Sequence, residues 1–294
     1  MKPGARFWIC TAGTVAGALR DFPQIQGIQT ARMFGPPLGF STHHSLQITV
    51  NRQFSRGLSL YANYVWAKTL ANANSSAHND NPNAPLDYYN LRLEKAYSDF
   101  DVPHALKAYA TYELPVGSGK FLWRNAGRIG NLLAGGWNMS AIVNYYSGTP
   151  LEFLGSSPLA SGWNGAVNRA NVAAGALHNA NFRKSGFDFA SIASPANTYL
   201  DKSKFSDPMP LTLGSAAPNY GSIRGFGQIN EDFALSKNTK IGEQARFQLR
   251  MEALNVFNRS QLRAINTNVN NPLFGQVTNI VGARTVQVGL RLDF

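Results

Sequence analysis

The sequence predicts an all-β fold, because hydrophobicity alternates with a period of two residues in one segment after another. Connections that alternate between short and long support this prediction. So does the lack of any apolar run close to the roughly 18 residues that a membrane helix needs. Together these observations predict an antiparallel transmembrane β-barrel segment with about seven to eight or more amphipathic strands and long external loops.

Seven amphipathic strands are expected. In each strand one face is apolar, and the other carries Asn, Gln, Arg, Glu or Lys, which suits a water-filled lumen better than a dry core. Arg52 falls on the apolar face, but at a strand end, where an Arg side chain reaches the membrane interface at little cost. In chain order the expected strands cover 46–51, 58–66, 107–114, 137–145, 232–236, 246–253 and 286–294.

The last of these segments shows the pattern most clearly, and it ends on an aromatic residue. Alternate side chains of a strand point to opposite faces, so the apolar residues of this segment share one face. We expect that face to meet lipid and the polar one to meet the lumen. The apolar residues are Val286, Val288, Leu290, Leu292 and Phe294.

The connections orient the strands. Tight hairpins are expected at 55–57 and 242–244, and an intermediate linker at 115–135. Outer-membrane barrels have short periplasmic turns and long external loops, so we place the long linkers outside. Trp137 then lies at the periplasmic rim, and Trp66 and Tyr145 lie at the outer rim, as an aromatic girdle requires. The long linkers are 69–103, 150–228 and 258–283.

Composition is consistent with a barrel wall. The chain has 294 residues, of which 44% are hydrophobic, yet its mean hydropathy is −0.21. Polar residues that face a lumen would lower the average in this way. The single Cys10 excludes an intrachain disulfide and a cysteine-based metal cluster. The net charge of +11 favours anionic partners, but Lys and Arg are scattered, so we expect lipid headgroups rather than nucleic acid.

The N-terminal region 1–40 is ambiguous. It reads as a loop or as one extra strand, and Lys2 and Arg6 before a weakly apolar stretch are also loosely similar to a secretory signal. A barrel with an even number of strands and both ends in the periplasm needs at least one more strand upstream of 46–51. Residues 6–20 would have to supply it. Otherwise we expect the chain to lack the front of the barrel.

Several stretches resemble the C-terminal part of the barrel of Oar-like TonB-dependent transporters of the outer membrane. The resemblance covers 41–294, and the order, spacing and ending of the stretches agree. The matching stretches are 45–68 (SLQITVNRQFSRGLSLYANYVWAK), 98–120 (SDFDVPHALKAYATYELPVGSGK), 135–151 (GGWNMSAIVNYYSGTPL), 221–241 (GSIRGFGQINEDFALSKNTKI), 246–262 (RFQLRMEALNVFNRSQL) and the terminal strand.

The resemblance implies an incomplete part of a barrel of roughly 22 strands, in the outer membrane of a Gram-negative-type bacterium. We expect the plug, the TonB box and the N-terminal part of the barrel to be missing partners of this segment. Its other partners would be outer-membrane lipids, an unknown external substrate, and the barrel-assembly machinery, which would recognise the C-terminal strand ending in Phe294. The segment would form wall and external substrate-binding loops, so transport by this chain alone is not expected.

No catalytic, cofactor-binding or metal-binding residue is expected, and the chain is not predicted to be an enzyme. Asp99, Asp101 and His104 lie close together in sequence, but no matched nucleophile accompanies them. The resemblance makes them a strand-start motif at the rim, with Asp and His bonding loop backbone. Three further groups are read as structural: His43-His44 on opposite strand faces, a turn at 117–120, and a solvated loop at His78, Asn79 and Asp80.

The sequence is also compatible with two other functions. A self-sufficient barrel of about eight strands, acting as a porin or an adhesin, requires a strand within 1–34 that pairs with the terminal strand. A soluble β-sandwich that binds a ligand would bury its apolar faces and have modest loops. The long linker at 150–228 counts against the sandwich, because structureless loops of that length are uncommon in compact soluble domains.

Overall fold

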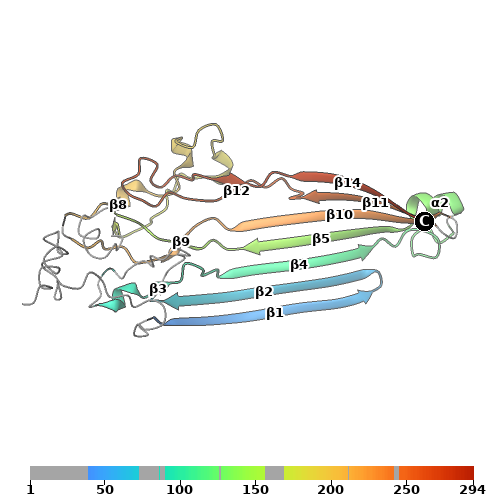
Figure 1. Ribbon diagram of the computed structural model, residues 1–294, viewed down its shortest axis with the longest axis horizontal. Helices are drawn as coiled ribbons and strands as arrows, with labels where there is room; N and C mark the ends of the chain where they lie inside the picture. The colour runs from blue at the N-terminus through green and yellow to red at the C-terminus, as the bar shows by residue number, and fades with distance from the viewer. Residues whose placement is uncertain are drawn as a thin grey trace, which may run out of the picture.

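The computed structural model describes residues 39–72, 86, 90–125, 127–155, 169–210, 212–241 and 245–294. One long antiparallel sheet forms the body of the molecule, and the long connections gather at one end of it (Figure 1). We call that end the loop end and the opposite one the turn end. The expected extra strand or leader within 1–38, and His78, Asn79 and Asp80, lie outside the described residues.

All seven predicted strands are present, and most of them extend further than predicted. Each long strand pairs only with its neighbours in chain order, and a short strand, β3 (Ala96–Tyr97), adds to β2. The order in the sheet is β1 (Ser41–Ser55), β2 (Leu58–Ala71), β4 (His104–Glu113), β5 (Trp137–Tyr146), β10 (Gln228–Ile241), β11 (Ala245–Leu254) and β14 (Thr285–Asp293). This confirms the all-β fold and the strand count.

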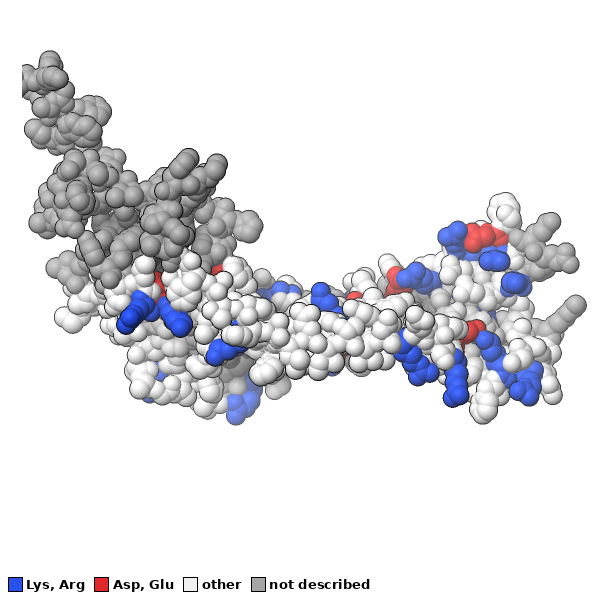
Figure 2. Space-filling model, turned by 90° about the horizontal axis from the view of Figure 1, so that it is seen from below, with Lys and Arg blue, Asp and Glu red and all other residues white. Residues whose placement is uncertain are grey.

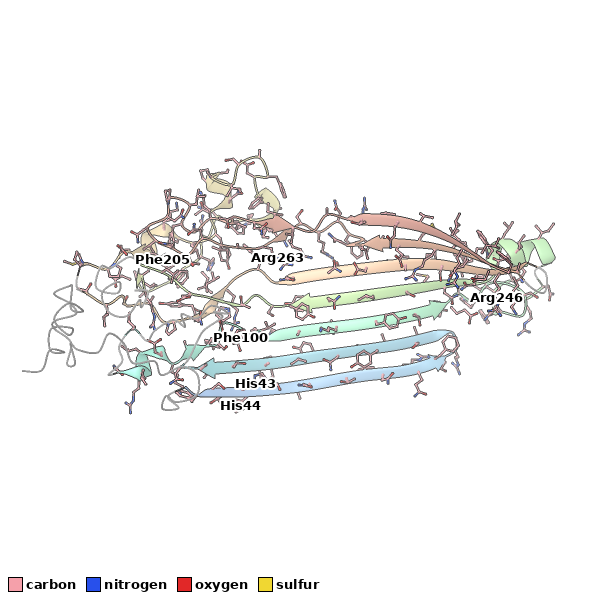
Figure 3. All side chains as sticks on the ribbon, viewed as in Figure 1. His43, His44, Phe100, Phe205, Arg246 and Arg263 are labelled. Carbon is pink, nitrogen blue, oxygen red and sulfur yellow. The ribbon has the colours of Figure 1, made fainter. Side chains whose placement is uncertain are left out.

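The register places like side chains in rows across the sheet. On one face Leu235 lies between Met139 and Met251, and Met251 lies opposite Val288. We call this the apolar face; its large side chains stay exposed, 64% for Val288 and 69% for Leu290. On the other face, which we call the polar face, one row consists of Thr49, Asn63, Lys107, Asn144 and Asn230. Figure 3 shows side chains along all these strands.

The turn end has the predicted short connections. Arg56 and Gly57 join β1 to β2 with φ angles of +53° and +85°, the left-handed pair that a two-residue hairpin turn favours. At the second hairpin Ile241 pairs with Ala245. The intermediate connection from β4 to β5 contains a helix that the sequence reading did not include, α2 (Arg128–Ala134).

The described parts of the long connections, predicted only as long external loops, contain short strands and 3₁₀ turns of their own. Together they form a lobe with its own small antiparallel sheets: β6 (Pro150–Leu151) with β9 (Tyr220–Arg224), β7 (Asn171–Val172) with β8 (Phe205–Ser206), and β12 (Gln261–Leu262) with β13 (Ile280–Val281). Four 3₁₀ turns complete it: η1 (Leu91–Glu94), η2 (Lys184–Gly186), η3 (Pro195–Asn197) and η4 (Lys202–Lys204). Two clusters of buried side chains form the interior: Phe153, Ala170, Leu177, Leu200, Ala216, Ile223 and Phe274 in one, and Phe187, Leu262 and Val277 in the other. We call this unit the loop lobe.

The sheet is open, with β1 and β14 as its edges. Because each of the seven long strands is antiparallel to the next, the two edge strands run in the same direction. Direct pairing of one edge with the other would therefore be parallel. Within the described residues, neither edge has a further partner strand. In the described part of the chain, no helix is long and apolar enough to cross a membrane.

Candidate functional site

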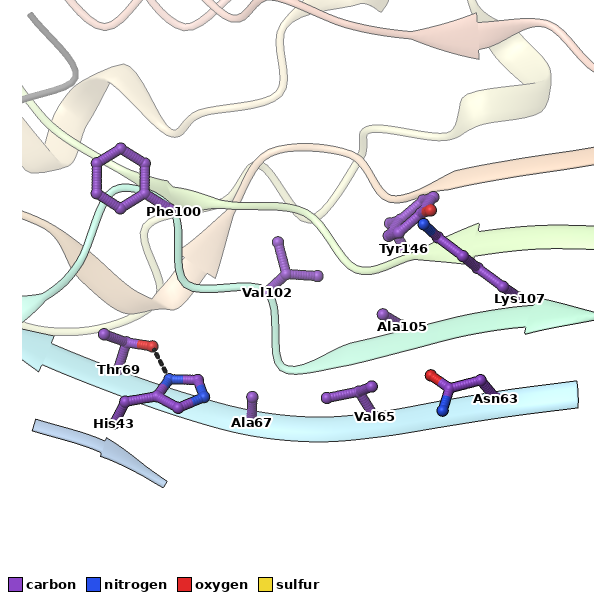
Figure 4. Close-up of a pocket in the computed structure, with 10 residues that line it drawn as sticks. All are labelled: His43, Asn63, Val65, Ala67, Thr69, Phe100, Val102, Ala105, Lys107 and Tyr146. Atoms are coloured by element: carbon purple, nitrogen blue, oxygen red, sulfur yellow. Dashed lines mark hydrogen bonds between the residues drawn. The ribbon is translucent and has the colours of Figure 1, made fainter. Parts of the chain in front are cut away.

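A groove of about 390 Å³ lies on the polar face, close to the loop end (Figure 4). Strands β1, β2, β4 and β5 form its floor, and the segment between β3 and β4 forms one side. It is lined by His43, Asn63, Val65, Ala67, Thr69, Phe100, Val102, Ala105, Lys107 and Tyr146. The strand residues in this set all belong to the polar face, because alternate positions of each strand point the same way.

The groove offers cationic, hydroxyl and aromatic groups. His43 shares a hydrogen bond of 2.8 Å between its Nδ1 and Thr69 Oγ1. The Lys107 ammonium lies 5.7 Å from the centre of the Tyr146 ring, a cation–π contact that holds it over the floor. The exposed ring of Phe100 lies at the mouth of the groove (Figure 4).

Asp101 holds the side of the groove in place. Its Oδ1 accepts a hydrogen bond from the backbone N–H of Thr69 at 2.5 Å, and its Oδ2 forms an ion pair with Arg224 at 2.7 Å. The carboxylate is 1% exposed, so this pair is desolvated. The backbone between Phe100 and Val102 is thereby held beside β2.

Arg224 connects this segment to the loop lobe. Its guanidinium also donates to the carbonyl oxygens of Asp101 at 2.8 Å, Gly148 at 3.3 Å and Gly221 at 3.1 Å. The Tyr97 ring lies 5.3 Å away, with its face toward the guanidinium. One side chain therefore ties together three segments that are far apart in sequence, which a planar group with five donors does well.

A second buried ion pair lies in the loop lobe. Arg169 Nη2 lies 2.5 Å from Glu94 Oε2, and its Nη1 donates to the carbonyl oxygen of Leu93 at 3.3 Å. Glu152 interacts with both members of this pair, and its ionised form is disfavoured. Burial raises its pKa, and the positive charge of Arg169 only partly offsets this effect.

Comparison with known families accounts for the wall. Residues 3–287 match the family described as the outer membrane beta barrel domain. This chain belongs to that family. The protein therefore lies in the outer membrane of a Gram-negative-type bacterium. No match was found among curated proteins, and none among solved structures.

In an outer-membrane barrel the two faces have fixed surroundings. The apolar face meets lipid and the polar face meets the lumen, so the groove opens into the lumen below the loop lobe. Trp66 and Tyr145 lie on the apolar face toward the loop end, and Trp137 lies on it at the turn end. These are the rim positions expected from the sequence. A soluble sandwich is not favoured, because the apolar face of this single sheet is exposed.

Asp99, Asp101 and His104, at the start of β4, do not form one site. Asp101 is committed to Arg224 and to loop-end backbone, as expected for a strand-start motif. His104 differs from the expectation: its Nδ1 shares a hydrogen bond of 2.8 Å with the Tyr64 hydroxyl rather than with loop backbone. His104 is also on the apolar face, since it lies opposite Trp66. Asp99 accepts a hydrogen bond from Ser98 Oγ at 3.3 Å.

His43-His44 and residues 117–120 have the structural positions predicted from the sequence. His43 faces the groove, and its neighbour His44 takes the other face, opposite Lys68. Residues 117–120 form a turn, in which the Lys120 N–H donates to the carbonyl oxygen of Gly117 and Lys120 Nζ pairs with Glu113 at 2.7 Å. Among the described residues, no three His, Cys, Asp or Glu side chains converge as metal ligands.

Sequence reasoning missed the residues that organise the loop end. Arg224 and Arg169 lie in long linkers, and no periodicity marks them as buried. Arg224 offered one signal, since it lies between glycines at 221 and 225 in a stretch that carries the family resemblance. Its partner, Asp101, lies more than a hundred residues earlier in the chain, so only the fold identifies the pair.

Proposed function

We propose that this chain forms wall and external loops of a TonB-dependent transporter-like receptor, which binds a large or scarce solute outside the cell and admits it. The folding of the loop lobe carries this proposal. A lobe with its own core and buried ion pairs is a fixed surface, as solute recognition needs. The resemblance over 41–294 to the Oar-like members of that class supports the same function.

The groove supports passage of a polar solute beneath the lobe. Lys107 and His43 would bind anionic or acceptor-rich groups, and Phe100 and Tyr146 provide flat apolar surfaces beside them. Most of the groove lies on strands rather than on loops, so its geometry is held by the ladder of the sheet. The role proposed for it is binding during entry, without catalysis.

The eight-stranded porin or adhesin is the weaker alternative. Since β1 and β14 run in the same direction, an antiparallel closure needs one more strand between them. That strand would have to come from the part of the chain outside the described residues. A folded lobe over the lumen also works against an open diffusion pore.

Energy-dependent uptake in the native host tests the proposal. We would compare wild-type cells, a strain without the gene and a Lys107→Glu strain, and measure by mass spectrometry which solutes leave the medium. Loss of uptake of specific solutes in the deletion strain, together with sensitivity to a protonophore, is the expected result. Uptake that persists after the proton-motive force is removed would instead indicate a porin.

A further inference from the structure

The connection between β4 and β5 carries an exposed apolar cluster at the turn end. Phe121 is 87% exposed, Ile129 75% and Leu133 67%. Leu122, Trp123 and Leu132 are exposed beside them. Contiguous exposed apolar side chains of this kind mark an interaction surface, because water alone would not favour them.

Helix α2 aligns part of the cluster on one face. Ile129, Leu132 and Leu133 have the spacing of residues that lie above one another on a helix. All three are exposed, so this face packs on no described part of the protein. A short amphipathic helix with an unpartnered apolar face fits the boundary between lipid headgroups and acyl chains.

The helix is fixed to the apolar face of the barrel wall. Trp137 Nε1 donates to the carbonyl oxygen of Leu133 at 3.2 Å. Lys237 Nζ donates to the same oxygen at 3.0 Å and to that of Gly135 at 2.7 Å, and lies 5.0 Å from the centre of the Trp137 ring. Both side chains belong to the face that meets lipid, since Lys237 lies opposite Trp137 and Leu249.

These contacts also explain a lysine on the lipid-facing side. An ammonium there is costly unless it reaches the interface or a partner. Lys237 does so by satisfying free carbonyls at the C-terminus of α2, where a positive charge is favourable. The C-terminus of the helix therefore lies beside the turn-end edge of the lipid-facing wall.

The charge of the turn end matches an anionic lipid surface. The acidic side chains of its described residues, Glu113 and Asp293, are each paired with a cation. Figure 2 shows Lys and Arg side chains toward both ends of the sheet, with the turn end on the right, and a mostly uncharged middle. Of the basic residues here, Arg52 and Lys237 lie on the apolar face, Arg56, Lys120 and Arg124 lie in the connections, and Lys240, Arg246 and Arg291 face the lumen.

We propose that α2 and residues 121–123 form an interfacial anchor, which lies among the headgroups of the phospholipid leaflet at the turn end. Ile129, Leu132 and Leu133 enter the upper acyl region, and Arg52, Arg56, Lys120 and Arg124, which do not face the lumen, contact lipid phosphates. The anchor fixes the depth and rotation of this part of the wall. It rests on the outer-membrane location and does not depend on which solute the barrel admits.

Depth-dependent quenching tests the anchor in the full chain. A fluorophore on Leu133→Cys, in a Cys10→Ser background, is measured in phosphatidylcholine vesicles with and without phosphatidylglycerol, with nitroxide quenchers near the headgroup or at the chain end. The expected result is roughly a twofold or greater loss of fluorescence with the headgroup-proximal quencher and a smaller loss with the other. Phosphatidylglycerol should increase the loss.

Two label positions serve as controls. A label at Leu290→Cys, on the apolar face, should be quenched and so reports that the sheet is inserted. A label at Gln248→Cys, on the polar face, should not be. If the label at position 133 is quenched no more than the one at position 248 while the one at position 290 is, the anchor proposal is wrong.

A matched pair of substitutions tests the attachment of the helix. Lys237→Ala removes the lysine that holds α2, and Lys240→Ala removes the same charge from the polar face of the same strand. Quenching at position 133 should fall by about half in the first variant and remain unchanged in the second. Equal effects of the two substitutions, or none from Lys237→Ala, would contradict the attachment.

Discussion

The loop lobe and the strand wall use similar side chains in opposite ways. In the lobe, Phe153 and Leu200 are 0% exposed, and the charges of Glu94 and Asp101 are paired inside. In the wall, the large apolar side chains are mostly on the surface, as Val288 and Leu290 are. One chain thus has a core that excludes water and a face that replaces water with lipid.

The difference shows that the two regions depend on different solvents for stability. Burial from water stabilises the lobe, by roughly 25 cal/mol for each Å² of apolar surface removed. On the wall, lipid is as apolar as the side chains, so shortening one of them changes little, whereas adding a charge changes much. Matched substitutions in the two regions should therefore change stability differently: truncation should matter most in the lobe, and an added charge should matter most on the lipid-facing wall.

The largest effect is expected from truncation in the core of the lobe. Phe153→Ala should destabilise the lobe by about 3–5 kcal/mol, because the ring packs against Phe205 and Tyr220 and leaves a cavity. Val288→Ala in the wall should cost less than about 1 kcal/mol in a bilayer. Hydrogen exchange of lobe and strand amides along a urea titration measures both. Similar costs would remove the distinction between the regions.

Breaking the buried ion pair should have the next largest effect. Asp101→Ala leaves Arg224 charged without its carboxylate, at a cost of about 3 kcal/mol. Asp293→Ala breaks the exposed pair with Arg291, at a cost of at most about 1 kcal/mol. Limited proteolysis should cleave the lobe of the first variant much faster than that of the second. Equal resistance of the two would show that the pair does not hold the lobe.

A charge on the apolar face should destabilise the wall by about 2 kcal/mol or more. Leu290→Arg places a guanidinium toward lipid, whereas Gln287→Arg places one on the polar face opposite Glu252, at little cost. Equilibrium unfolding of both variants from vesicles measures the difference. A cost that is the same for both would mean that the faces are wrongly assigned.

The smallest effect is a pH dependence that belongs to the lobe alone. Burial raises the pKa of Glu152 above its usual value of 4.5, so the folded lobe holds a proton that the unfolded chain releases. The associated stability is complete below pH 4.5 and is lost as the pH rises through the pKa of the folded state. Glu152→Gln should flatten this part of the pH profile of lobe exchange, and a profile unchanged by the substitution would contradict the assignment.

The wall could be predicted from sequence because its rule is local. Adjacent residues such as Gln248 and Leu249 alternate in polarity within a single strand. Strands paired through tight hairpins must alternate in the same way, because their apolar side chains share one face. The predicted ends of the strands were less accurate. Strand β1 begins several residues before Leu46, in a polar stretch that carries His43 and His44. Pairing with β2, rather than hydrophobicity, extends that strand.

The lobe and the groove could not be predicted in the same way. Their contacts join segments far apart in the chain: Arg224 meets Asp101, and Arg169 meets Glu94. An Arg that is buried because it pairs with a distant carboxylate leaves no hydrophobic periodicity in the sequence around it. The groove was missed for a related reason, since His43, Lys107 and Tyr146 converge only when the strands are in register. Helix α2 was missed because seven residues are too short for a helical period to stand out.

The positions of the groove, the loop lobe and the anchor relative to the membrane all follow from which face of the sheet meets lipid. Single cysteines placed in turn at residues 286–292 of β14, in a Cys10→Ser background, can be labelled in vesicles with a lipid-soluble or a water-soluble reagent. We expect reactivity to alternate at every residue, with Val286, Val288, Leu290 and Leu292 modified from lipid and the residues between them from water. Uniform access to the water-soluble reagent along the strand would contradict the account.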